Sequence, residues 1–253
     1  MRLGQLEDQN QFVLRGGMLM RLWFRPLLRA VGDLDLVALF PFDLKEARRR
    51  FMPVLADRTI NDGVAFDSER CRVDGIWLNT NFPAARIYAA GEVDGEEGDF
   101  TVDITFGEPL IPIPTLEEYP MLGCDLSTSL WMCRPETILG RKLHALMHMG
   151  RQHWRPKDLN DIRLLLREVP LEESELPQAI VASFMSREEP LEHARTVFRQ
   201  DWWGMRMSAA KWFEFAQKRP ELEVPANLET VVEGIATRLK PILESLPQGG
   251  TGF

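Results

Sequence analysis

The amino-acid sequence predicts an α+β fold in which a strand-containing domain precedes a helical one. Three observations support this prediction. Short runs of β-branched and aromatic residues, bounded by turn-forming residues, occur in the first half of the chain. Beyond residue 135 the hydrophobic pattern has the period of helices, and strand patterns vanish. A stretch rich in proline and glycine, in which neither period persists, separates the two halves.

The composition excludes several classes of protein. The 253 residues, 45% of them hydrophobic, can bury a large core, and no apolar run approaches the ~20 residues needed to cross a bilayer. The N-terminal residues lack the apolar segment of a secretory signal. Three cysteines without a Cys-x-x-Cys pair predict neither a disulfide framework nor a zinc ribbon. We therefore expect a cytoplasmic globular protein that does not bind a membrane.

The first half of the chain alternates between helices and strands. A short apolar run at residues 12–14 leads into a Gly-Gly turn, and a helix follows. Helices are predicted at residues 17–24 and 44–55, and strands at residues 33–40, 72–79, 86–93 and 100–106. The last of these strands alternates strictly between apolar and polar residues, which is typical of a strand with one buried face.

The second half is predicted to be helical. The linker lies around four prolines, Pro109, Pro112, Pro114 and Pro120, and we divide the chain into domains at residues 1–118 and 119–253. Helices are expected at residues 135–149, 156–167, 176–185, 191–199, 208–218 and 228–246. Two of them begin with a proline, which a helix tolerates in its first turn.

Asp33 and Asp35 open the predicted strand at residues 33–40. Residues two apart in a strand project from the same face, so the two carboxylates point together while the apolar residues between and after them face the core. Adjacent carboxylates repel each other, and a bound divalent cation relieves the repulsion. The pair is therefore a candidate metal site, whereas an isolated Asp-x-Asp is more often an exposed strand edge.

A third carboxylate, Asp103, lies on the polar face of the predicted strand at residues 100–106. If this strand neighbours the strand of the Asp-x-Asp pair, three carboxylates come together near the turn at Gly16 and Gly17. Such an arrangement can hold two Mg²⁺ ions against a nucleoside triphosphate. Glycines in the turn let backbone N–H groups approach phosphate oxygens at a helix N-terminus.

The order of these features resembles the polymerase-beta-type nucleotidyltransferase superfamily and, within it, the AbiEii/AbiGii-like toxin family. The features shared with that family are the Gly16-Gly17 turn, the pattern Arg29-x3-Asp33-x-Asp35 and the strand that carries Asp103. Residues 136–146 and 155–162 resemble the family's helical motif, a lysine-containing helix and then an Arg/Lys-Asp-x-x-Asp turn. The resemblance covers residues 12–167, with the motifs in order.

The resemblance implies a minimal nucleotidyltransferase domain, a mixed sheet with flanking helices, followed by a helical domain that completes the active-site cleft. It implies Mg²⁺-dependent transfer of a nucleoside monophosphate from a nucleoside triphosphate to an acceptor hydroxyl, at the 3′ end of tRNA or on a protein. It also implies the toxin of a toxin–antitoxin or phage-defence system, with a cognate antitoxin as partner.

The same resemblance assigns roles to individual residues. Metal binding is implied for three carboxylates, Asp33, Asp35 and Asp103, of which Asp103 is also a candidate general base. Nucleotide binding is implied for a second set, Gly16, Gly17, Arg29, Lys142 and Asp161. Lys142 would contact the triphosphate, and either Asp158 or Asp161 would orient that lysine or the nucleotide. The expected catalytic set is Asp33, Asp35, Asp103, Lys142 and Asp158.

Two departures from the superfamily pattern support an alternative. Gly17 stands where the superfamily usually has a serine, and Val31 and Gly32 stand where a threonine or serine is expected before Asp33. Both hydroxyls would contact phosphate or metal. The alternative is a non-catalytic nucleotide-binding or protein-interaction module with the same fold. Such a module binds nucleotide without consuming it.

The charge distribution bears on the acceptor. A net charge of −8 argues against a general nucleic-acid coat, yet residues 141–167 hold seven basic side chains against two acidic ones. This segment favours a phosphate-bearing ligand and modestly favours RNA. It also contains His144, His148 and His153. These residues suggest a further alternative, a zinc metallohydrolase, although imidazoles near a helix end are commoner without metal.

Overall fold

The computed structural model describes residues 1–24, 31–57, 60, 62–93, 95–121, 125–204 and 206–247. Its contacts divide the chain into two compact units. The sheet unit comprises Met1–Leu22, Arg29–Glu108 and Pro114–Cys133. The helical unit comprises Trp23–Leu28, Pro109–Ile113 and Arg134–Phe253.

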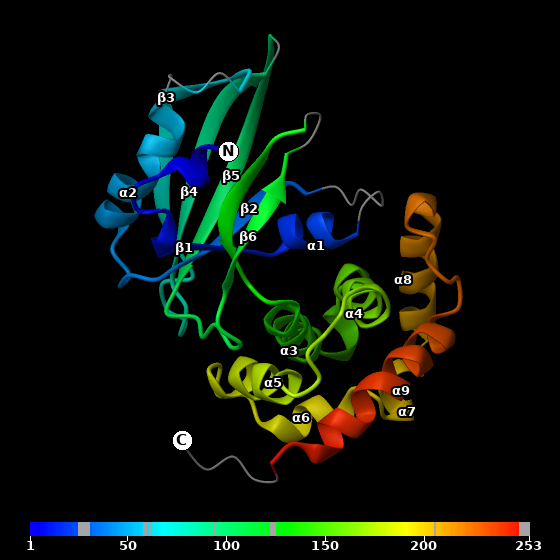
Figure 1. Cartoon of the computed structure of the whole chain (residues 1–253). Coiled ribbons are helices and arrows are strands. Elements are labelled where there is room, and N and C mark those ends of the chain that lie inside the picture. Colours follow the sequence, from blue (N-terminus) through cyan, green and yellow to red (C-terminus); the bar gives the residue numbers. More distant parts are fainter. Residues whose placement is uncertain are drawn as a thin grey trace. The chain divides into compact units, whose positions relative to one another are not determined.

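The sheet unit is built on a mixed seven-stranded sheet (Figure 1). The strands are β1 (Phe12–Arg15), β2 (Asp33–Ala38), β3 (Val64–Ile76), β4 (Ala84–Val93), β5 (Glu96–Phe106), β6 (Thr115–Pro120) and β7 (Ser127–Met132). Their order across the sheet is β3-β4-β5-β2-β1-β7-β6. The pairs β2/β5 and β1/β7 are parallel and the others are antiparallel. The predicted α+β fold class is thus confirmed.

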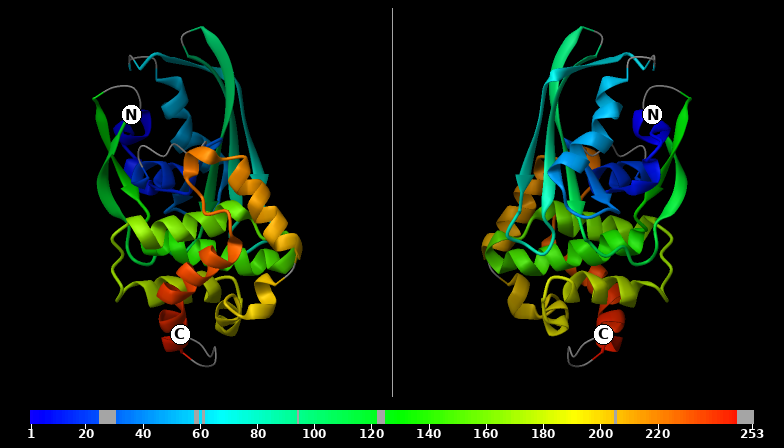
Figure 2. Two further views of the ribbon diagram at one scale, coloured as in Figure 1. Left: turned by 90° about the vertical axis from the view of Figure 1, so that its right-hand side faces the viewer. Right: turned by 90° about the vertical axis from the view of Figure 1, so that its left-hand side faces the viewer.

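Apolar residues on one face of the central strands form the core of this unit. Phe40 packs edge to face against both Phe12 and Phe106, with ring centroids 5.7 and 5.4 Å away. Helix α2 (Leu44–Ala56) packs against β3 (Figure 2). It buries Phe51, whose ring packs against that of Phe12 in the same cluster. The helix begins at Asp43, whose side chain accepts hydrogen bonds from the first-turn amides. The opposite, polar face of the strands is left for the charged residues.

The remaining elements of the sheet unit are short. They are α1 (Gly17–Trp23), which follows β1, and two 3₁₀ helices, η1 (Arg2–Gln5) and η2 (Gln9–Gln11). Arg2 of η1 is buried and forms two hydrogen bonds with Asp62, of 2.7 and 2.9 Å. This pair attaches the N-terminal segment to the residues just before β3.

The helical unit contains α3 (Pro135–His153), α4 (Pro156–Glu168), α5 (Leu176–Met185), α6 (Leu191–Thr196), α7 (Gln200–Trp203), α8 (Arg206–Gln217), η3 (Pro220–Leu222) and α9 (Leu228–Ser245). Pro135 and Pro156 occupy the first turns of their helices, as predicted. Gly150, with φ 67°, interrupts α3 near its end. None of the helices in the described ranges is long and apolar enough to cross a membrane.

Buried aromatic residues hold the helical unit together. Trp212 is fully buried and donates its indole N–H to the carbonyl of Pro225 at 2.8 Å. Trp154 is also buried and packs edge to face against Trp203 at 5.1 Å. Phe184 of α5 is buried where α5 packs against α3. Trp154 and Trp212 are therefore core residues of this unit, whereas Trp203 is only half-buried.

Two strands have no counterpart in the sequence prediction, and the strand expected at residues 72–79 overlaps only the end of β3. We expected a linker and then only helices after residue 107, but β6 and β7 continue the sheet, and the sheet unit extends to Cys133. The expected division between residues 118 and 119 falls inside β6. The apolar signal is weak because β6 carries two glutamates and ends at a proline, and β7 is short and half polar.

Candidate functional site

Four charged side chains form a row across four adjacent strands of the sheet unit. Asp35 of β2 is in register with Asp103 of the parallel strand β5. Arg15 of β1 stands beside Asp35, and Arg86 of β4 stands beside Asp103. Because residues in register share one face of a sheet, the two carboxylates lie at the centre of the row and a guanidinium lies at each end. Asp33 precedes Asp35 by two residues and shares this face.

Asp103 is held by Arg86. Nε and Nη2 of Arg86 each lie 2.6 Å from a different carboxylate oxygen of Asp103. This two-pronged pairing fixes both the position and the orientation of the carboxylate. Asp103 is 3% exposed, so its charge depends on Arg86 for compensation.

Arg15 is placed more loosely, between two acidic groups. Its Nη2 lies 3.4 Å from Asp35, and its Nη1 lies 3.6 Å from Glu108. Burial lowers the pKa of Arg15, but Glu108 and Asp35 outweigh burial and raise it overall. Glu108 is itself buried and accepts a hydrogen bond of 3.0 Å from the hydroxyl of Thr105. Arg15 therefore stays charged beside the carboxylates.

Asp35 is a partly buried carboxylate that lies near two other acidic side chains. Burial raises the pKa of Asp35, and Asp33 and Asp103 raise it further. Arg15 and a hydrogen bond from the backbone N–H of Gly17 act in the opposite direction without cancelling the rise. A cation bound beside Asp35 would favour the ionised carboxylate and so lower its pKa.

The turn at Gly16 and Gly17 is shaped around the Asp35 carboxylate. Gly16 has a φ of 72°, in the left-handed region that favours glycine. A Cβ at this position would lie 2.1 Å from Oδ2 of Asp35. Gly17 then donates its N–H to the same carboxylate. The two glycines thus position a site carboxylate.

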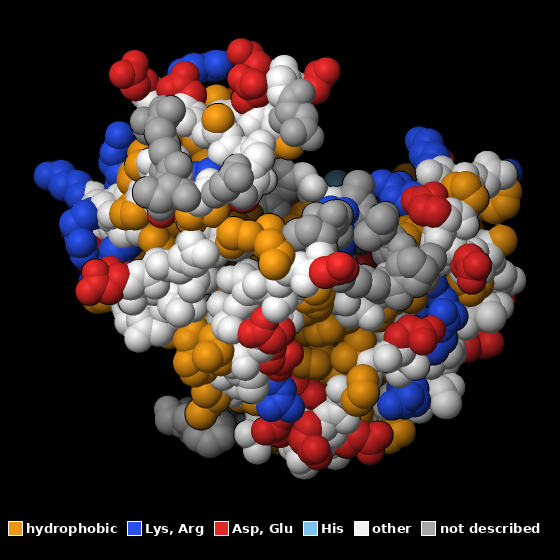
Figure 3. Space-filling view, turned by 45° about the horizontal axis from the view of Figure 1, so that its top comes forward, with side chains coloured by type: hydrophobic (Ala, Val, Ile, Leu, Met, Phe, Trp, Pro, Cys, Tyr) orange, Lys and Arg blue, Asp and Glu red, His pale blue; other side chains and the backbone are white. Residues whose placement is uncertain are grey.

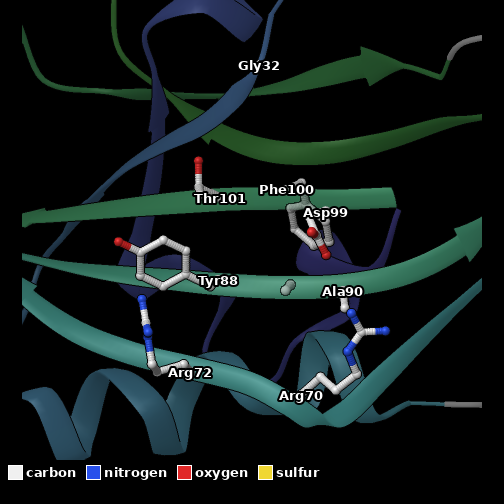
Figure 4. Close-up of a pocket in the computed structure, with 9 residues that line it drawn as sticks. Gly32, Arg70, Arg72, Tyr88, Ala90, Asp99, Phe100 and Thr101 are labelled. Carbon is white, nitrogen blue, oxygen red and sulfur yellow. The ribbon is translucent and has the colours of Figure 1, made fainter. Parts of the chain in front are cut away.

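A pocket of about 420 Å³ lies over β3, β4 and β5 next to the charged row. Its lining includes Arg72, Tyr88 and Thr101, which are in register with one another, and Thr101 is in register with Asp33. Arg72 extends toward the ring of Tyr88, with its guanidinium carbon 4.3 Å from the ring centroid (Figure 4). Arg70 also lines the pocket. The sheet therefore places the Tyr88 ring and the Arg72 guanidinium in the same cross-strand row as Asp33, with Arg70 elsewhere in the pocket lining.

The helical unit holds a separate charged cluster on α3 and α4. Nζ of Lys142 lies 2.6 Å from Oδ2 of Asp161 and 3.3 Å from Oδ1 of Asp158. Asp158 also accepts a hydrogen bond of 2.6 Å from Nε of Arg155. Asp158 and Asp161 are 3% and 1% exposed, so both buried charges depend on these cations. The sequence motif at residues 155–162 therefore forms a compact ion-pair network around one lysine.

These clusters bring together most of the predicted site residues. The sheet unit gathers Gly16, Gly17, Asp33, Asp35 and Asp103, and the helical unit gathers Lys142, Asp158 and Asp161. Arg29 lies outside the described residues. Sequence reasoning missed Arg15, Arg86 and Glu108. Arg15 could have been identified from the sequence, because it directly precedes the Gly-Gly turn. Arg86, the partner of Asp103, can be identified only once the strand register is known.

The surface has no single sign of charge on the face shown in Figure 3. Among the described residues of that face, Asp and Glu side chains are interspersed with Lys and Arg side chains. This mixture agrees with the net charge of −8. Any contact with an anionic ligand is therefore local to particular clusters.

A family model described as nucleotidyl transferase AbiEii toxin, type IV TA system, matches residues 1–234. The chain belongs to the AbiEii family. The predicted recognition is thereby confirmed, and membership identifies a nucleotidyltransferase family of type IV toxin–antitoxin systems. No curated protein sequence matched the chain.

Two solved structures from Helicobacter pylori are similar to this AbiEii family member. JHP933 is 15% identical, with a TM-score of 0.48, and the match covers 97% of this chain and 87% of that one. A candidate nucleotidyltransferase is 14% identical, with a TM-score of 0.49, and the match covers 97% and 90%. At such identities and scores these structures carry no argument about function, and the family assignment rests on the family model.

Proposed function

We propose that this AbiEii family member transfers a nucleoside monophosphate from a nucleoside triphosphate to an acceptor hydroxyl. In this reaction a bond forms between the acceptor oxygen and the α-phosphorus, the bond to the bridging oxygen breaks, and pyrophosphate leaves. The observation that carries the proposal is the alignment of Asp35 with Asp103 across parallel strands, with Asp33 on the same face. A cytoplasmic location supplies both nucleotides and acceptors.

The carboxylates fit Mg²⁺. Oxygen ligands suit this hard cation, and a bound cation would favour the ionised form of Asp35, whose pKa is raised by burial and by the neighbouring Asp33 and Asp103. Asp33, Asp35 and Asp103 are the residues that would hold it. The chemistry supplied there is activation of the attacking hydroxyl and charge neutralisation on the leaving pyrophosphate.

The remaining residues position these groups. Gly16 and Gly17 hold the Asp35 carboxylate, and Arg86 orients Asp103. In the helical unit we assign triphosphate binding to Lys142, which its buried carboxylate partners orient. A lysine suits this role because its ammonium group acts as a compact point charge toward phosphate.

The pocket beside Asp33 favours RNA as the acceptor. Tyr88 offers a ring on which a base can stack, and Arg70 and Arg72 offer charge for a phosphate. A protein hydroxyl would make little use of this combination. We therefore propose the 3′ end of tRNA as acceptor, with a protein acceptor as the other outcome of the test. The family also supports a cognate antitoxin, which would counteract growth inhibition when both are expressed.

The decisive experiment incubates the purified chain with each α-³²P nucleoside triphosphate, Mg²⁺ and total tRNA. The Asp35→Asn variant tests the site. Glu97→Gln is the matched control, because Glu97 is exposed on the same strand as Asp103 but lies outside both the charged row and the pocket lining. Label that moves to RNA in the wild type and control, but not in Asp35→Asn, supports the proposal. Label found on protein instead would identify a protein hydroxyl as the acceptor.

A second function is favoured by one observation. Both carboxylate oxygens of Asp103 are engaged by Arg86, and Gly17 supplies no hydroxyl. A module that binds nucleotide without turnover would retain such pairing. In that case no label moves, while nucleotide binding by equilibrium dialysis persists.

A further inference from the structure

Two histidines and a glutamate converge in the helical unit, away from the Lys142 network of α3 and α4. One ligand atom from each of His144, His148 and Glu189 lies within 4.8 Å of the others. The two histidines are four residues apart on α3, so they share one face of the helix. Their rings stack at an interplanar angle of 19° with centroids 5.6 Å apart. The i, i+4 spacing places both imidazoles on the same side for one ligand.

The glutamate reaches this face from the turn between α5 and α6. Its backbone N–H donates to the carbonyl of Phe184 at 3.1 Å, and the preceding residue, Glu188, has a positive φ of 57°. A non-glycine residue in this region is strained, and such strain often marks functional segments. The ring of Phe184 also packs edge to face against His144 at 5.2 Å. One phenylalanine thus fixes both the glutamate backbone and a histidine ring.

A third histidine supports the glutamate from α6. Nδ1 of His193 lies 2.5 Å from Oε1 of Glu189, four residues earlier. In metal sites, a hydrogen-bond partner behind each ligand sets its orientation and strengthens binding. Three of the four histidines in the chain therefore gather at one carboxylate.

We propose that His144, His148 and Glu189 form a binding site for a divalent transition-metal ion, Zn²⁺, and that His193 positions the Glu189 carboxylate. Imidazole nitrogen and carboxylate oxygen are donors that Zn²⁺ accepts in three-ligand sites with an open fourth position. Mg²⁺ prefers an all-oxygen set and is not expected here. The three donor atoms already lie within 4.8 Å of one another.

The bound ion would tie α3 to the turn between α5 and α6. His144 is 6% exposed and anchored in the core, whereas His148 and His193 are exposed. A link between a buried helix and a surface turn stabilises the folded helical unit, because the unfolded chain has no preformed site. This site is independent of the carboxylate row, since all of its residues belong to the helical unit.

The test measures Zn²⁺ binding by calorimetry on the full chain after chelator treatment and dialysis. It is carried out in the Asp35→Asn background with excess Mg²⁺, so that the carboxylate row does not contribute. We expect saturable binding that raises the unfolding temperature, and visible absorption of a four-coordinate ion when Co²⁺ replaces Zn²⁺. His148→Ala should weaken the affinity by ~100-fold through the loss of a ligand, and His193→Gln by ~10-fold through the loss of a supporting hydrogen bond.

His153→Ala is the matched control, because His153 is an exposed histidine of the same helix outside the group. It should bind Zn²⁺ as the wild type does. The unfolding temperature of each metal-free variant separates a lost ligand from a damaged fold. The proposal is overturned if His148→Ala and Glu189→Gln both leave the Zn²⁺ affinity unchanged. It is also overturned if the protein with both of these residues intact binds no Zn²⁺.

Discussion

The Asp35 carboxylate fills the space that a side chain at residue 16 would need. A Cβ on Gly16 would fall 2.1 Å from Oδ2 and under 3.0 Å from Cγ and Cβ of Asp35. The whole aspartate side chain would therefore have to move, because its short length leaves no flexible end to give way. The glycine before α1 and the carboxylate on β2 are thus one structural unit.

Gly16→Ala should lower transfer activity and stability more than a glycine substitution that incurs backbone strain alone. Gly107 has the same φ of 72°, but a Cβ there would meet nothing within 4 Å, so Gly107→Ala is a close control. The control should cost about 1 to 2 kcal/mol of unfolding free energy from the left-handed backbone. Denaturant unfolding and label transfer measure both effects. Equal losses in the two variants would show that the contact with Asp35 is unimportant.

Asp35→Asn should separate activity from stability. Transfer should fall by on the order of 100-fold or more, because the central oxygen ligand loses its charge. The metal-free variant should unfold at a higher temperature than the wild type at neutral pH, since a buried charge beside Asp33 and Asp103 is removed. Calorimetric scans without metal provide the measurement. A lower unfolding temperature would mean that the pairing with Arg15 outweighs the repulsion.

The metal-free protein should lose stability as the pH rises through the range in which Asp35 ionises. Burial, together with Asp33 and Asp103, raises the pKa of Asp35 above its ordinary 3.8. At pH values between the ordinary and the raised pKa of Asp35, the folded protein holds more protons than the unfolded chain. The free energy of unfolding therefore falls as the pH increases. Carboxyl ¹³C NMR should show that Asp35 titrates at a higher pH than an ordinary aspartate. Asp33→Asn should shift it to lower pH, and an unchanged midpoint would contradict the assigned cause.

The sequence was sufficient for the elements with strong periodic patterns. The helix expected at residues 176–185 matches α5, and the strand expected at residues 33–40 begins where β2 begins. β6 and β7 were missed because glutamate, proline and small polar residues give these two strands little apolar signal. β7 joins the sheet by pairing with β1, which is a long-range contact, and β6 pairs with β7 at the edge.

The candidate site was predictable only in part. The i, i+2 spacing gave Asp33 and Asp35 a common face, and strict alternation gave Asp103 its polar face. Their alignment depends on strand register, which no local pattern encodes, so Arg86 could not be identified as the partner of Asp103. Glu189 was missed beside His144 for the same reason, because helix packing brings the two residues together.

Arg86→Gln should destabilise the protein because it leaves the buried Asp103 carboxylate without compensation. The pair lies between a surface and a buried ion pair, since the side chains are 33% and 4% exposed. We therefore expect a loss of about 2 kcal/mol, between the values typical of those two cases. Arg72→Gln is the control, because Arg72 is 64% exposed and pairs with Asp74 on its own strand. Urea unfolding should show almost no change for this variant.

Asp161, rather than Asp158, should be the residue that positions Lys142. The Lys142 ammonium lies 2.6 Å from Asp161 and 3.3 Å from Asp158, and the latter shares its carboxylate with Arg155. Asp161→Asn should therefore raise the KM for nucleoside triphosphate by ~10-fold, the loss expected for one charged hydrogen bond, while Asp158→Asn has a smaller effect. A change in KM at unaltered unfolding temperature distinguishes positioning from a general structural role. Lys157→Gln, an exposed basic residue of the same helix, should leave KM unchanged. If Asp158→Asn raises KM more than Asp161→Asn, the shared carboxylate controls the lysine and the assignment is reversed.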